Sequence, residues 1–381
     1  MDHSKEVARA RDIAQKVIAP SAASNDKEAR FSLEAVEALG KGGLMGLMVP
    51  KDFGGIGLGP RAMSDVIATI AEVDASVAMV YLMHAMGTAC IVAAPSASSF
   101  APTLRDIAAG KHLTTLAFSE KGSRSHFWTP VSKAEKTSTG ARLNAKKSWV
   151  TSAGHATSYV VTALSHAAKG PTDSTLYLVD GKTPGLRVDA PWDGMGLRAN
   201  ASSPMTLEGC DVAEDRRLTE EGTGFKSMLE VVLPMFNLGT ASVALGLCRA
   251  AVAATVTHLR TATFEHLGAT LGESLPTLRA TLASMQIETD GLASRIADTI
   301  DHLEKPGDLT MLRVLEVKAA AGESAIRVTS DAMRACGGAA FSKHTSIERF
   351  FRDAHAGAVM APTGDVLREF IGKALLGIPL F

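Results

Sequence analysis

Hydrophobic positions recur at intervals of three and four residues over the first part of the chain. Residues 6–18 and 32–40 follow this spacing, and acidic residues just after Ser32 favour a helix start there. A glycine-rich stretch at 42–60 interrupts the pattern, which resumes over 64–94 and 103–110. The pattern predicts a helical N-terminal region with one long loop.

The periodicity changes near residue 113 and changes back near residue 216. Short β-prone segments separated by turn-forming residues predict an antiparallel sandwich or barrel, at 114–118, 148–151, 159–163, 175–179, 186–188 and 205–207. From residue 224 to 376 Ala- and Leu-rich helical stretches return, with interruptions at 264–276, 305–308 and 337–342. The predicted fold is α+β and mainly α: an N-terminal helical domain (1–112), a middle antiparallel β-domain (113–215) and a C-terminal helical bundle (216–381).

Composition excludes several classes of function. The net charge of -1 over 381 residues offers no general attraction to nucleic acid or anionic lipid. The cysteines Cys90, Cys210, Cys248 and Cys336 lie far apart and lack metal-ligand spacing, so we expect no metal site and a reducing, cytoplasmic location. The N-terminus is charged and no uninterrupted apolar run reaches the ~20 residues that span a bilayer, so neither a signal peptide nor a membrane helix is expected.

Four sequence blocks occur in an informative order. They are GLMGLMVP at 43–50, LNAKKSWVTSAG at 143–154, GFK at 224–226 leading to ALG at 244–246, and CGGAAF at 336–341 running to IERFFRDA at 347–354. Taken singly, Trp149 reads as a core aromatic of a strand and the paired glycines read as a turn. Taken together and in register, the blocks resemble the acyl-CoA dehydrogenase family. The family's fold has a helical, a β and a four-helix-bundle domain, which agrees with the periodicity.

The resemblance implies a bound FAD held between two subunits, and therefore a homodimer or homotetramer. A flavin needs an apolar slot for its ring and cationic or N–H partners for its pyrophosphate. One subunit's flavin face would comprise Phe118, Ser119, Ser125, Trp149 and Thr151. The neighbour would supply Arg260 for the pyrophosphate, with Thr263 and Phe264, although a lone arginine there is also typical of a solvated helix end. The adenosine side would involve Arg334, Gly337 and Gly338, and a C-terminal flavin loop would involve Thr363 and Asp365.

The catalytic base is where the sequence departs from the family. Dehydrogenation of an acyl thioester needs a carboxylate opposite the flavin to remove the α proton. The family's two positions for that glutamate correspond here to Ala361 and Phe236. The flavin-side loop also differs, since residues 119–128 read SEKGSRSHFW where the family has Thr-Glu-Pro-Gly-Ala-Gly-Ser-Asp. We therefore leave the catalytic residues unassigned.

Three functions remain open. The first, preferred because it is the family's common reaction, is an acyl-thioester dehydrogenase with electron-transfer flavoprotein as partner and a base from elsewhere; Glu230, His355 and Asp365 are near in sequence. The second is a flavin-dependent monooxygenase served by a flavin reductase, in which His126 or Trp128 orients the substrate. The third is a silent subunit that completes another chain's site.

Overall fold

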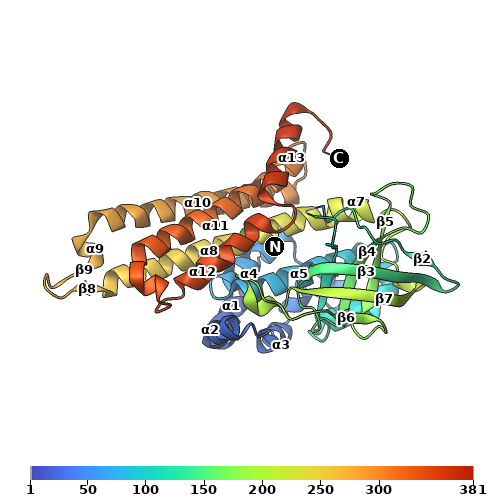
Figure 1. Ribbon diagram of the computed structural model, residues 1–381, viewed down its shortest axis with the longest axis horizontal. Helices are drawn as coiled ribbons and strands as arrows, with labels where there is room; N and C mark the ends of the chain where they lie inside the picture. Colours follow the sequence, from blue (N-terminus) through green and yellow to red (C-terminus); the bar gives the residue numbers. More distant parts are fainter. Residues whose placement is uncertain (1, 125, 381) are drawn as a thin grey trace.

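The N-terminal domain is a cluster of six helices. The computed structural model describes residues 2–124 and 126–380, so the predicted cofactor residue Ser125 lies outside the described part. The helices are α1 (Ser4–Ile13), α2 (Ala19–Glu28), α3 (Leu33–Lys41), α4 (Pro60–Ala71), α5 (Ala75–Val92) and α6 (Ala101–Ala108), as shown in Figure 1. The glycine-rich stretch forms the loop between α3 and α4, with two short 3-10 turns, as predicted.

The middle domain contains two small sheets. The three-stranded sheet has the order β1–β4–β5 and the four-stranded sheet the order β2–β3–β7–β6. The strands are β1 (Thr114–Ala117), β2 (Glu135–Lys136), β3 (Gly140–Val150), β4 (Ser158–Leu164), β5 (Ser174–Asp180), β6 (Leu186–Val188) and β7 (Ser203–Ala213). The prediction of a wholly antiparallel domain was wrong in one place, because β1 pairs with β4 in parallel. These two strands are separated by more than a hairpin turn, and a parallel pair requires such a long connection.

The C-terminal domain is built on long antiparallel helices. Helix α8 packs against α10, α11 and α12, while α13 packs against α11 and extends toward the top of Figure 1. The elements are α7 (Gly224–Ser227), α8 (Leu233–Thr261), β8 (Thr263–Phe264), β9 (Ala269–Thr270), α9 (Leu271–Ser274), α10 (Pro276–Glu304), α11 (Thr310–Phe341), α12 (Ile347–Val359) and α13 (Gly364–Leu376). The predicted class, mainly helical with a β insert and three domains, is confirmed.

Helix α5 is the core element that joins the first two domains. The Tyr81 hydroxyl donates to the Leu44 carbonyl at 2.9 Å, and His84 Nδ1 accepts from the Thr114 amide at 3.2 Å. By length and apolar composition α5 and the segment Gly224–Thr261 would suffice to cross a membrane, but 89% and 78% of their apolar windows are buried inside the fold. Burial on every side explains why α5 carries almost no polar face.

Several element boundaries differ from the prediction for identifiable reasons. The stretch 64–94 is two helices, because the Asp74 carboxylate accepts from the Ser76 and Val77 amides and caps a new helix. Helix α2 was missed because Pro20 looks like a helix breaker, yet proline fits the first turn of a helix. The predicted break at 337–342 is present at its first residue: Gly337 is non-helical at φ +51°, and a short helical stretch resumes after this kink and ends at Phe341.

Candidate active site

A cavity of about 870 Å³ lies where the three domains meet. The β-domain contributes Ser119, Trp149 and Thr151 to its lining, and Phe236 and Ala361 line it from the bundle. Met79 and Met83 of α5 complete the apolar wall. A volume of this size with a few polar groups is typical of a small-molecule site.

Trp149 is aimed into this cavity by an irregularity in β3. Lys147 pairs with Met205 and Val150 with Ser203, so β3 has one residue more than β7 over this stretch. The extra residue gives Trp149 a φ of +57°, a conformation that costs energy for a bulky L-residue. Its side chain stays 65% exposed, and its ring meets the edge of Trp192 at a centroid distance of 5.6 Å. A strained, exposed indole beside a cavity indicates a binding surface for a flat ring.

Two hydroxyl residues and one phenylalanine accompany Trp149. The Ser148 amide donates to the Ser119 carbonyl at 2.9 Å, which fixes the loop after β1 against β3. The Thr151 hydroxyl lies 3.1 Å from that of Ser202. Phe118 is buried and lines a smaller void of about 70 Å³ that also touches Phe236 and Ala361. The structure therefore brings together Phe118, Ser119, Trp149 and Thr151, four of the predicted cofactor residues.

Glu120 is the one carboxylate among the described residues that line the main cavity, and it is already paired. Lys147 Nζ donates to Glu120 Oε1 at 2.6 Å, and the Ser132 hydroxyl donates to the same oxygen at 2.6 Å. Burial alone would raise the pKa of Glu120, but the Lys147 charge and these hydrogen bonds outweigh it and hold the pKa below its usual value. Glu120 is thus an ionised structural partner of Lys147 and is poorly suited to act as a free base.

A second buried lysine holds the wall that contains Ala361. Lys318 of α11 donates to the carbonyls of Met360 and Pro362, at 2.8 and 2.5 Å. Burial lowers the pKa of Lys318 to about 7, and no described carboxylate forms an ion pair with it. Its Nζ also lies 6.0 Å from the centroid of the Phe236 ring. The sequence analysis missed Lys318, although its place among buried residues three and four apart on α11, from Val314 to Ala325, was a usable signal.

The other candidate bases and substrate contacts lie elsewhere. Glu230 and Asp365 are exposed, and Asp365 lies 3.5 Å from Arg368. His355 Nδ1 is 2.7 Å from its own helix carbonyl at Phe351. His126 stacks on Trp128 at 4.9 Å, and Trp128 packs on Phe370 of α13 at 5.6 Å. None of these five residues lines the described part of the cavity.

Matches to known families decide what this architecture is. Residues 2–111 match the acyl-CoA dehydrogenase N-terminal domain, 115–210 the middle domain and 222–376 the C-terminal domain of that family. The chain belongs to the acyl-CoA dehydrogenase family.

Individual members of the acyl-CoA dehydrogenase family align with this chain over almost its whole length. It is 28% identical to the probable acyl-CoA dehydrogenase FadE25 of Mycobacterium tuberculosis, over 98% of this chain and 95% of the relative. It is also 28% identical to an acyl-CoA dehydrogenase of Bacillus subtilis, over 96% of both chains. The solved butyryl-CoA dehydrogenase of Megasphaera elsdenii superposes with a TM-score of 0.92 at 23% identity, over 99% of this chain and 100% of the other.

Members of this family bind FAD, and the cavity fits the flavin ring. The exposed face of Trp149 has the apolar area that an isoalloxazine would cover, and Ser119 and Thr151 line the same wall with hydroxyl groups. Thr363 caps α13, its hydroxyl accepting from the Val366 amide at 3.4 Å, two residues after Ala361.

The remaining predicted cofactor residues gather at the other end of the bundle, at the left of Figure 1. Arg260 lies in the last turn of α8, and Cys336 Sγ lies 4.0 Å from Thr255 Oγ1, which places the last turns of α8 and α11 side by side. This group consists of Arg260, Thr263, Phe264, Arg334, Gly337 and Gly338. Within the described part of one chain, none of these residues lines the Trp149 cavity.

The IERFFRDA block joins the bundle to the other two domains. Arg352 donates to the Asp26 carboxylate at 2.6 Å, and Asp353 Oδ1 accepts from the Leu197 amide at 2.7 Å. Burial raises the pKa of Asp353 to about 7. These two contacts hold the bundle against the other two domains, and they therefore position the residues that line the cavity.

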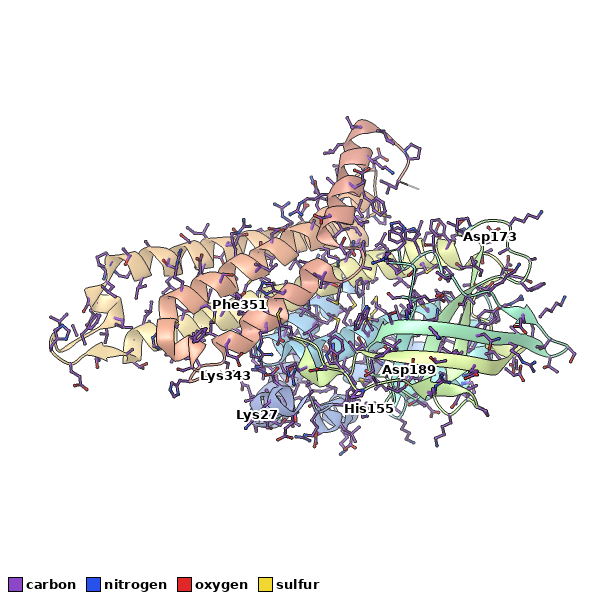
Figure 2. All side chains as sticks on the ribbon, viewed as in Figure 1. Lys27, His155, Asp173, Asp189, Lys343 and Phe351 are labelled. Atoms are coloured by element: carbon purple, nitrogen blue, oxygen red, sulfur yellow. The ribbon has the colours of Figure 1, made fainter. Side chains whose placement is uncertain are left out.

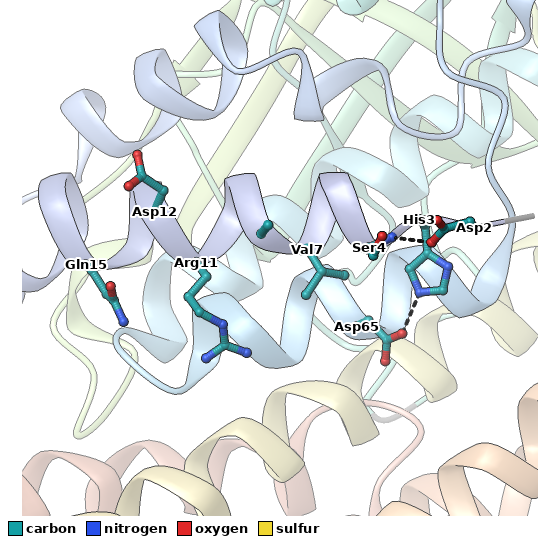
Figure 3. Close-up of a pocket in the computed structure, with 9 residues that line it drawn as sticks. Asp2, His3, Ser4, Val7, Arg11, Asp12, Gln15 and Asp65 are labelled. Carbon is teal, nitrogen blue, oxygen red and sulfur yellow. Dashed lines mark hydrogen bonds and ion pairs between the residues drawn. The ribbon is translucent and has the colours of Figure 1, made fainter.

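A separate hollow, of about 580 Å³, lies on the N-terminal domain. It is a shallow surface between α1 and α4, where His3 Nε2 lies 2.7 Å from Asp65 (Figure 3). Its charges are mixed and it shares no residue with the cavity beside Trp149. We assign the candidate site to the Trp149 cavity alone.

Proposed function

We propose that the protein is a FAD-dependent oxidoreductase that acts on the CH–CH group of an acyl thioester carried by CoA or an acyl carrier protein. The observation that carries the proposal is the cavity in which Trp149 on the β-domain faces Phe236 and Ala361 on the bundle. The names of the relatives support it, since FadE25 and the Bacillus subtilis protein are acyl-CoA dehydrogenases.

Each wall has a distinct task in this proposal. FAD, when bound, would supply the acceptor for the hydride that leaves the β carbon of the substrate, and the α proton would pass to a base outside the described cavity lining. The Trp149 indole would support the ring, and the hydroxyls of Ser119 and Thr151 would be available to donate hydrogen bonds to it. Met83 and Phe236 exclude water from the reacting carbons. Electron-transfer flavoprotein is the proposed acceptor of the electrons.

A spectrum and an anaerobic titration test the proposal. The purified protein should be yellow, and an acyl-CoA should bleach the flavin absorbance in the absence of oxygen. Ala361→Glu places a carboxylate in the cavity wall and should increase the bleaching rate. Ala361→Gln has a similar size without the charge and is the matched control. A yellow protein that no thioester bleaches, even with Ala361→Glu, would contradict the dehydrogenase function.

A flavin-dependent monooxygenase is the second candidate, and one observation favours it. The described cavity lining offers no carboxylate other than Glu120, which is committed to Lys147. Reduced flavin with oxygen does not require an α-proton base, and a flavin reductase would be the partner. Oxygen consumption that depends on added reductase and substrate supports this alternative. A colourless protein that gains flavin only with a homologue would instead indicate a silent subunit.

The site also bears on assembly and location. We propose a homodimer or homotetramer in which Arg260 and Phe264 of one chain reach the flavin of another, because one chain separates them from Trp149. The four cysteines are free and buried, which supports our proposal of a reducing cytoplasmic environment.

A further inference from the structure

A second hollow, of about 460 Å³, opens beside the main cavity on the outer face of the β3–β7–β6 sheet. Both are lined by Lys121, Ser148 and Trp149, so a ligand held in the main cavity can extend into the hollow. The remaining lining includes Lys146, Arg187, Asp189 and Thr206. Asp189 is labelled in Figure 2, where it lies on the β-domain.

Strand register places the basic residues in one row. Thr206 of β7 lies between Lys146 of β3 and Arg187 of β6, each directly opposite it. Residues directly opposite each other project from the same face of a sheet, so the three side chains share the outer face. The Lys121 amide donates to the Lys146 carbonyl at 3.0 Å, which adds Lys121 at the end of the row.

The row carries more positive charge than its surroundings neutralise. Arg187 lies 2.7 Å from Glu208 and 3.5 Å from Asp189, and Asp189 also accepts from the Thr206 hydroxyl at 2.8 Å. Lys121 and Lys146 have no ion pair among the described residues.

The same strand offers an internal comparison. Arg142, on the same exposed face of β3, lies directly opposite Asp211 and forms an ion pair with it at 2.8 Å. At Lys146 the opposite residue is instead Thr206, a neutral hydroxyl donor. The unpaired charge is therefore confined to the part of the strand beside Trp149, and the whole chain, at -1, has no basic excess to explain it.

We propose that this row, Lys121–Lys146–Thr206–Arg187, is a binding site for a phosphoryl group of a ligand seated in the main cavity. Two ammonium groups and a guanidinium supply the charged donors that phosphate oxygens accept from, while the Thr206 hydroxyl, which donates to Asp189, lies between Lys146 and Arg187. The phosphoryl group has two possible sources, the pyrophosphate of FAD and the phosphate of CoA or a phosphopantetheine arm. The identity of the ligand rests on the proposed function. That the ligand carries a phosphoryl anion is inferred from the row of residues alone.

Binding of inorganic pyrophosphate to the purified protein tests the anion class without turnover. Isothermal titration should show binding that weakens about tenfold in Lys146→Glu and is retained in Lys146→Arg, because charge-assisted hydrogen bonds are lost only in the first. Lys136→Ala, an exposed lysine of β2 outside the hollow, is the control and should bind as wild type. Pyrophosphate binding that is absent, or equal in all variants, would overturn the site.

Two further measurements distinguish the sources. If the phosphate is that of FAD, Lys146→Glu should weaken FAD affinity about tenfold, measured by flavin fluorescence. If it is that of the substrate, KM should rise for an acyl-CoA and not for the matching acyl-pantetheine, which lacks phosphate. No change in FAD affinity or in either KM would overturn the role in the cavity. Because the pyrophosphate titration needs no thioester, failure of the proposed reaction and failure of this site give different results.

Discussion

The two ends of the long bundle helices differ in whether a single chain forms an enclosed cavity there. At the cavity end, Phe236 of α8 and the Met360–Pro362 wall face Trp149 across a formed cavity, backed by the buried Lys147–Glu120 pair. At the other end Arg260, Thr263 and the Gly337 kink lie on the exposed surface. In the proposed assembly, packing within the chain forms one half of the cofactor site, and Arg260 and Phe264 of a second chain supply the other half.

The largest expected effect is on stability at the cavity end. Lys147→Met leaves Glu120 buried without its partner and should lower the free energy of unfolding by about 3–5 kcal/mol. Adding Glu120→Gln to that variant should recover part of the loss, since no uncompensated charge remains. At the far end Arg334→Met removes only an exposed pair with Asp331, for which about 0–1 kcal/mol is expected. Urea unfolding measures all of them, and equal losses at both ends would contradict the comparison.

The next effect concerns FAD affinity and tests whether the site is shared. Trp149→Ala and Arg260→Ala should each weaken FAD binding about tenfold or more, through lost ring contact in the first and lost pyrophosphate contact in the second. Mixing the two variants under conditions that exchange subunits should restore one intact site per mixed pair. Flavin fluorescence titration detects the recovery. Absence of recovery, with exchange shown by mass spectrometry, would mean that the two residues serve one chain.

A smaller effect is the pH dependence set by Lys318. Its pKa is lowered to about 7 from a usual value near 10.5, so above pH 7 the native protein releases a proton that the unfolded chain keeps. The free energy of unfolding should therefore increase as pH rises from 7 toward 10. Lys318→Met should remove this increase, and the difference between the two unfolding curves at pH 6 and pH 9 measures it. If Lys318→Met kept the same pH dependence as the wild type, the pKa of Lys318 would not be lowered in the native protein.

The smallest effect on stability is expected at the tip of α11. Phe341 is 83% exposed, so Phe341→Ser should change the free energy of unfolding by no more than about 0.5 kcal/mol. If this end packs against another chain, the same change should shift sedimentation toward smaller species. Ser342→Ala, at the adjacent position, is the control. A purely monomeric wild type would remove the basis of this prediction.

Periodicity was sufficient for the order of helices, β-domain and bundle, because each has its own spacing of apolar residues. It was insufficient for β3, of which only the last residues were predicted. Arg142, Asn144 and Lys146 alternate with buried residues, which is the pattern of a half-buried strand, but two of those buried residues are Ala141 and Ala145, and alanine is a poor strand former. The length of β3 follows from pairing with β7, which is a tertiary property.

The candidate site was predictable only in part. Trp149, Thr151, Ser119 and Phe118 were expected together from the family resemblance, and the structure assembles them. Lys147 and Lys318 were missed because lysine side chains are usually exposed. That these two are buried follows from the residues packed around them in the folded chain. The direction of Trp149 also depends on the β3 irregularity, which needs the partner strand to be recognised.

Lys318 contacts the main chain on both sides of residue 361 and not the side chain between them. Descendants of a common ancestor can therefore exchange the amino acid at this position while the backbone around it stays in place. The side chain at residue 361 is thus uncoupled from the hydrogen bonds that hold this wall of the cavity.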